Sequence, residues 1–124
     1  MEKTPSNLSL NEFFTAAKSF PEGSKEFCDI LEKAVLYYPH DERANLNAAN
    51  AAMSKGAYHR ASLYLGNAGN GAEAEYLRGV LAALEKDYGK ALQHLGKAGK
   101  SDRVQAALLQ VEQLRNAEPV QYLQ

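Results

Sequence analysis

The sequence is poor in the residues that favour β-strands. Of its 124 residues only eight are Ile, Val or Thr, and there is no Trp. Because β-branched and aromatic side chains are the ones that suit a pleated sheet, this scarcity strongly disfavours an all-β or α/β fold. Ala and Leu supply 20 and 16 residues instead. Both are strong helix formers, so we expect an all-α fold.

An excess of charge of one sign and long apolar runs are also missing. The 14 basic and 15 acidic residues are scattered and leave a net charge of −1. Nucleic acids need clustered Lys and Arg, so no nucleic-acid partner is expected. No apolar run approaches the roughly 18 residues that cross a bilayer, and we expect no direct membrane insertion. The N-terminus lacks a secretory signal, which leaves a cytoplasmic protein and a piece of a longer, processed protein as alternatives.

The residues that carry chemistry are few and dispersed. Cys28 is the only cysteine, and the three histidines lie far apart in the sequence. A zinc site needs three or four such ligands, so we expect no metal and no other cofactor. The run GKAGKS at 96–101 resembles the end of a phosphate-binding loop, but His94 stands where that motif has its first glycine. Neither Ser24 nor Ser101 has a neighbouring His, and we predict that the protein is not an enzyme.

Helix start and stop signals follow one another along the chain. Ser9 with Glu12 forms the pattern of a capping box, and Asn70 with Glu73 repeats it. Pro and Gly residues separate the apolar, helix-spaced segments, except at 86–87, where neither occurs. The signals predict seven helices, over residues 10–20, 25–38, 42–54, 58–67, 72–85, 88–97 and 102–115.

An internal repeat links two of these segments. Residues 58–69 read YHRASLYLGNAG and residues 88–99 read YGKALQHLGKAG, with six identities at an offset of 30. A unit of two short helices cannot bury both of its faces alone, so we expect neighbouring units to stack. The positions expected to be buried between helices are Leu31, Ala34, Ala49, Ala61, Leu65, Gly79, Ala91 and Leu95.

These residues resemble the tetratricopeptide repeat (TPR), a helix-turn-helix unit whose helices meet at small residues. Ala61 with Leu65 and Ala91 with Leu95 match its second helix. Gly79 is the matching small residue in a first helix. The tryptophan of the pattern is absent, and its two positions are occupied by Asn45 and Glu75. The resemblance implies a right-handed stack of three antiparallel helix pairs plus a C-terminal capping helix.

This fold implies one repeat domain and one working surface. The domain is expected at 9–115, with residues 1–8 disordered or added for expression and 116–124 a loose tail. The resemblance places a peptide-binding groove on the concave face of the first helices. Its expected residues are Leu46, Asn47, Asn50, Met53, Tyr76, Leu77 and Val80.

Within this groove the two asparagines are the expected ligand contacts. In the family, Asn side chains from this face commonly bind the backbone of an extended peptide, because an amide donates and accepts. Arg43 and Arg103 are the only plausible cations for the subtype that grips a carboxylate. The alternative is that Asn47 and Asn50 satisfy helix ends or solvent. The resemblance therefore implies a non-enzymatic module for a protein or peptide partner.

A second resemblance concerns the cellular context. The run PHDERANLNAANAAMSKGAYHRA at 39–61 is similar to helical repeat segments at the C-terminal ends of larger envelope proteins of Bacteroidales. This resemblance implies a periplasmic or outer-membrane-associated segment. It also implies an alternative function, a structural spacer or assembly segment whose groove binds nothing.

Overall fold

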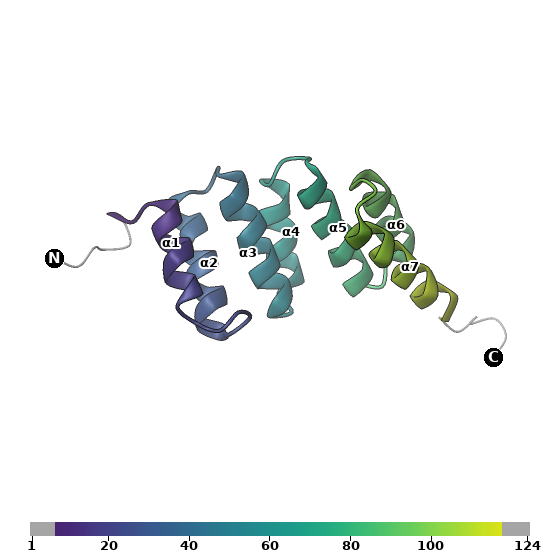
Figure 1. Cartoon of the computed structure of the whole chain (residues 1–124), viewed down its shortest axis with the longest axis horizontal. Coiled ribbons are helices and arrows are strands. Elements are labelled where there is room, and N and C mark those ends of the chain that lie inside the picture. The colour runs from purple at the N-terminus through teal and green to yellow at the C-terminus, as the bar shows by residue number, and fades with distance from the viewer. Residues whose placement is uncertain (1–6, 118–124) are drawn as a thin grey trace. The chain divides into compact units, whose positions relative to one another are not determined.

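The computed structural model describes residues 7–117 and shows an all-α chain there (Figure 1). The described part contains seven α-helices and no strand, as the sequence predicts. The helices are α1 (Leu10–Lys18), α2 (Lys25–Tyr37), α3 (Glu42–Ser54), α4 (Tyr58–Gly66), α5 (Ala72–Leu84), α6 (Tyr88–Lys97) and α7 (Asp102–Ala117).

The chain divides into two compact units between Gly69 and Asn70. Unit 1 contains α1 to α4, and each of these helices packs against the next one along the chain. Unit 2 contains α5 to α7, in which α6 packs against both of the other helices. The division falls inside the range 9–115. That residues 9–115 form one domain stays a prediction.

The structure describes a few residues of each predicted end segment. Leu8 belongs to the N-terminal segment that was expected to be disordered or added for expression; it packs against the core of unit 1, and its carbonyl accepts a hydrogen bond of 2.6 Å from the Tyr38 hydroxyl. Helix α7 was expected to end at residue 115, but it continues through Ala117. The rest of the predicted end segments, at 1–6 and 118–124, lies outside the described residues.

Side chains cap most of the helix starts. At α1, the Ser9 hydroxyl accepts from the Glu12 amide while the Glu12 carboxylate accepts from the Ser9 amide, which confirms the capping box. Ser24 accepts from the amide of Phe27 at the start of α2. Local hydrogen bonds of this kind satisfy backbone donors that have no partner inside the helix.

The predicted cap of α5 is wrong. This helix begins after Gly71, and no side chain caps it. Both residues of the predicted box interact with arginines instead, because Asn70 accepts from Arg78 and Glu73 pairs with Arg103.

The turns that end α3 and α5 share one backbone geometry. Gly56 has φ of 75°, and Lys86, 30 residues later, has φ of 64°. In each turn the next amide donates back to the carbonyl five residues earlier, at 2.8 Å, in the Schellman arrangement. The 86–87 boundary thus needs no Gly or Pro, because Lys86 takes the left-handed conformation itself.

The predicted helix interfaces are buried. All eight interhelical positions expected from the sequence belong to the buried class. In unit 2, α5 approaches α6 so closely that a Cβ atom added to Gly79 would lie 2.7 Å from Leu95 Cγ. Cys28 is also buried, and burial raises the pKa of its thiol, which is the behaviour of a small core residue.

Candidate binding grooves

A groove with an apolar floor opens on unit 1; we call it groove 1. It is lined by residues of α1, α2 and α3 and has a cavity volume of about 300 Å³. Ala17 and Leu31 are buried below it, while the cationic side chains on its rim are exposed. The lining residues are Phe14, Ala17, Lys18, Phe27, Leu31, Arg43 and Asn47.

The polar groups that line groove 1 are only partly satisfied by hydrogen bonds within the protein. The Asn47 side-chain nitrogen donates to the carbonyl of Arg43, one turn earlier, at 3.1 Å. No described residue donates to Asn47 Oδ1, so the amide keeps an acceptor for a ligand. The guanidinium of Arg43 lies 5.7 Å from the centre of the Phe14 ring, a distance typical of a cation–π contact.

Unit 2 has a groove of its own, which we call groove 2. It is lined by residues of α5, α6 and α7 and has a cavity volume of about 240 Å³. Its lining is almost entirely apolar, and the leucines at its edge are exposed to solvent. The lining residues are Tyr76, Val80, Ala83, Leu84, Leu95, Ala107, Gln110, Val111 and Leu114.

A charged cluster lies beside groove 2. The guanidinium of Arg103 stacks on the ring of Tyr76 at 3.9 Å and pairs with the carboxylate of Glu73. These contacts join the first turn of α7 to α5. Arg103 was a candidate ligand for a peptide carboxylate, but Glu73 already neutralises it.

The residues predicted for the groove divide between the two units. In unit 1, Asn47 lines groove 1, whereas Leu46 is half-buried outside it and Asn50 is exposed outside it. In unit 2, Tyr76 and Val80 line groove 2.

The remaining two predicted residues are not available to a ligand. Met53 and Leu77 are buried, with 8% and 6% of their surface exposed. Successive residues of a helix are turned by about 100°, and here Leu77 is buried in the interior while its neighbour Tyr76 lines groove 2. The predicted groove therefore includes two residues that face the interior, Met53 and Leu77.

Several lining residues were missed by the sequence analysis. Groove 1 takes Phe14 and Lys18 from α1, and groove 2 takes Gln110 and Leu114 from α7. The signal was present, because on every helix that contributes more than one lining residue these follow the i, i+3, i+4 spacing of one helical face. The identity of the neighbouring helix was the missing information.

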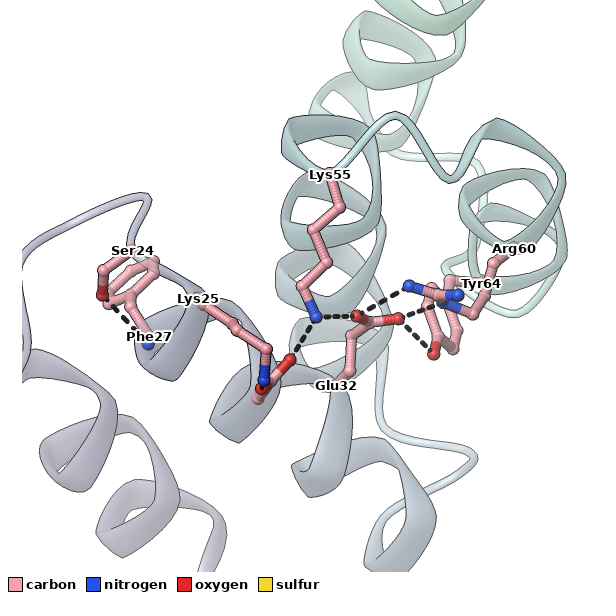
Figure 2. A network of polar contacts seen from close by, with 8 residues as sticks. Ser24, Lys25, Phe27, Glu32, Lys55, Arg60 and Tyr64 are labelled. Atoms are coloured by element: carbon pink, nitrogen blue, oxygen red, sulfur yellow. Dashed lines mark hydrogen bonds and ion pairs between the residues drawn. The ribbon is translucent and has the colours of Figure 1, made fainter.

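Glu32 is the centre of a polar network in unit 1 (Figure 2). Its carboxylate accepts from Lys55 at the end of α3, and from Arg60 and Tyr64 on α4. Asp29, one turn earlier on α2, accepts from Lys55 and from Lys25. The network thus joins three helices through side chains that Figure 2 shows converging on Glu32.

The network shifts the pKa values of its members. Burial alone would raise the pKa of Glu32, but hydrogen bonds from Arg60, Lys55 and Tyr64 outweigh it and hold that pKa below its usual value. Burial and the hydrogen bond to Glu32 raise the pKa of Tyr64 to about 12. Hydrogen bonds from Lys25 and Lys55 lower the pKa of Asp29 to about 2. The carboxylates of Asp29 and Glu32 are therefore ionised and paired at neutral pH, so the network serves to hold the three helices together.

The two positions that carry tryptophan in the repeat pattern hold buried polar residues. Asn45 is 1% exposed and donates to the carbonyls of Pro39 and Asp41. Glu75 accepts from Arg78 at 3.1 Å and lies 2.7 Å from His94 Nδ1, whose hydrogen bond holds the pKa of Glu75 below its usual value. Both side chains satisfy neighbouring groups instead of reaching into a groove.

Neither metal-ligating side chains of the described residues nor similarity to known proteins identifies a further site. Within residues 7–117, no group of three His, Cys, Asp or Glu side chains could hold a metal ion. No described helix is both long and apolar enough to cross a membrane. No protein-family model matches the chain, and no curated protein matches it. The two grooves are therefore the candidate functional sites of the chain.

Proposed function

We propose that the chain is a non-enzymatic interaction module of TPR-like type that binds protein segments in its grooves. Groove 1 is the observation that carries the proposal. It combines an open cavity of about 300 Å³ over an apolar floor with the acceptor Oδ1 of Asn47 on its rim. An apolar side chain of a bound segment loses contact with water on such a floor, while a backbone N–H donates to the amide oxygen.

The finer architecture belongs to the same proposal: a right-handed stack of three helix pairs plus a capping helix. The spacing of the elements supports it, because α3, α5 and α7 begin at residues 42, 72 and 102. At the position of Ala49 and Gly79, α7 carries Leu109, which is exposed. A leucine there prevents the close approach that α6 makes to α5, so α7 suits the role of a cap.

Selection from a random peptide-display library on the full chain tests the binding function. The double variant Asn47→Ala, Tyr76→Ala truncates one lining side chain in each groove. Asn50→Ala is the matched control, since Asn50 is exposed and lines neither groove. We expect selected peptides to bind the wild type and the control alike, and the double variant about tenfold more weakly.

Two results would replace this proposal with the structural spacer. One is a selection that yields no peptide. The other is a set of peptides that binds all three proteins equally, after circular dichroism has shown that the variants are folded.

A further inference from the structure

We propose that groove 1 selects protein segments that carry an acidic side chain beside an apolar one. The inference builds on the proposed function, because it names the ligand chemistry of one of the two grooves.

Three of the six described Lys and Arg residues of unit 1 form ion pairs inside the unit. Lys25, Lys55 and Arg60 all pair with the carboxylates of α2. Lys18 and Arg43 have no ion pair within residues 7–117, and both line groove 1. No Asp or Glu is among the lining residues of this groove. Groove 1 thus presents two uncompensated positive charges, which favour an anionic ligand.

The rest of groove 1 limits what kind of anion fits. Phe14, Phe27 and Leu31 form an apolar floor, and a small inorganic anion would leave this floor exposed. The guanidinium of Arg43 stays near the Phe14 ring, so a carboxylate that pairs with it lies next to the apolar surface. Asn47 Oδ1 on the same rim accepts a backbone N–H. A peptide with adjacent acidic and apolar side chains satisfies all three features.

Groove 2 provides an internal contrast. Its lining contains no charged residue, and Arg103 beside it is neutralised by Glu73. An acidic side chain gains nothing from groove 2. Selectivity for acidic segments should therefore depend on residues of unit 1 alone.

The test uses three pools of ten-residue peptides with acetylated and amidated ends. The pools are identical except for a central Asp, Asn or Lys, so that the only added carboxylate is a side chain. The amount of each peptide pool retained is measured on the immobilised wild type and on the immobilised variants Lys18→Gln, Arg43→Gln and Lys33→Gln. Lys33 is the matched control, because it is exposed, has no ion pair in the described chain and lies outside groove 1.

We expect the wild type to retain the Asp pool about tenfold more strongly than the Asn pool, and the Lys pool least. Arg43→Gln should reduce this preference to about threefold or less, and Lys18→Gln should reduce it in the same direction. Lys33→Gln should leave it unchanged. Raising the salt from about 50 to 300 mM should weaken the preference in the wild type, because exposed charges are screened.

The contradicting results separate this inference from the proposed function. Equal retention of the three pools, with weaker retention by the Asn47→Ala, Tyr76→Ala variant, overturns the acidic preference and leaves groove binding intact. A preference that Lys33→Gln reduces as much as Arg43→Gln also overturns it, since the effect then comes from overall charge. No retention of any pool overturns both proposals.

Discussion

Lys86 is the only non-glycine residue with positive φ among residues 7–117. Its backbone takes the conformation that Gly56 has at the equivalent turn of unit 1. A side chain in the left-handed region costs about 1–2 kcal/mol, because Cβ approaches the following carbonyl oxygen. The turn is retained since its hydrogen bonds satisfy the carbonyls at the end of α5.

Replacing Lys86 by Gly should relieve this strain. It should stabilise the protein by about 1 kcal/mol in total, because glycine also raises the conformational entropy of the unfolded chain and so offsets part of the gain. The reverse change, Gly56→Lys, should destabilise it by a similar amount. Urea denaturation of both variants measures the free energies of unfolding. Equal stability of Lys86→Gly and the wild type would show that the turn carries no strain.

At the scale of helices, the contact between α5 and α6 depends on one glycine. A Cβ atom at Gly79 would lie 2.7 Å from Leu95 Cγ and 3.2 Å from the carbonyl oxygen of Ala91, which belongs to the backbone. Gly79→Ala should thus push the helices apart and cost about 1–3 kcal/mol. Thermal or urea denaturation measures this loss.

Gly96 in α6 is the control for this prediction. A Cβ atom there meets nothing within 4 Å, so Gly96→Ala should stabilise the helix by up to about 1 kcal/mol. A stabilising effect of both alanines would contradict the close approach at Gly79.

The network around Glu32 predicts a loss of stability at high pH. The pKa of Tyr64 is raised from 10.0 to about 12 by burial and by the hydrogen bond to Glu32. Because the folded state holds this proton more tightly, the stabilising contribution is complete below pH 10 and is lost as the pH rises from about 10 to 12. Tyr64→Phe cannot ionise and should lose less stability across this range.

Denaturation curves collected between pH 9 and 12 measure the difference between wild type and Tyr64→Phe. The gap in unfolding free energy should narrow as the pH rises, because the wild type loses its hydrogen bond to Glu32. A gap that stays constant would mean that Tyr64 ionises as it does in an unfolded chain.

At the scale of the whole molecule, the sequence predicted the helices better than the grooves. Helix ends are set by local signals such as Ser9, Asp41 and Pro39, and all seven predicted starts coincide with the observed ones. Small residues at the repeat offset identified the helix contacts correctly, because the distance between two packed helices is limited by what lies between them. These features need no knowledge of distant residues.

The grooves required more than local signals. The sequence placed Asn47 and Val80 on one predicted surface, but each lines a groove of its own unit with residues from another helix. Phe14 joins Asn47 only because α1 and α3 both border the same hollow. Such neighbours depend on how α2 packs between them, which periodicity along one helix does not encode.

The two units carry related helix pairs with different groove chemistry. The turn geometry at Gly56 and Lys86 is the same, and each pair buries small residues where its helices meet. The groove residues differ, because groove 1 has uncompensated cations and groove 2 is nearly all apolar. Helix pairs that pack alike but line their grooves with different side chains agree with the proposed binding function.

The most direct test of the groove proposal is to map a bound peptide by NMR. A peptide selected on the full chain is titrated into the isotopically labelled protein, and amide shifts are followed for every described residue. The account predicts that the largest changes fall on lining residues of groove 1, such as Phe14 and Asn47, or of groove 2, such as Val80. Changes confined to the exposed leucines Leu36 on α2 and Leu63 on α4, with both grooves unaffected, would contradict it.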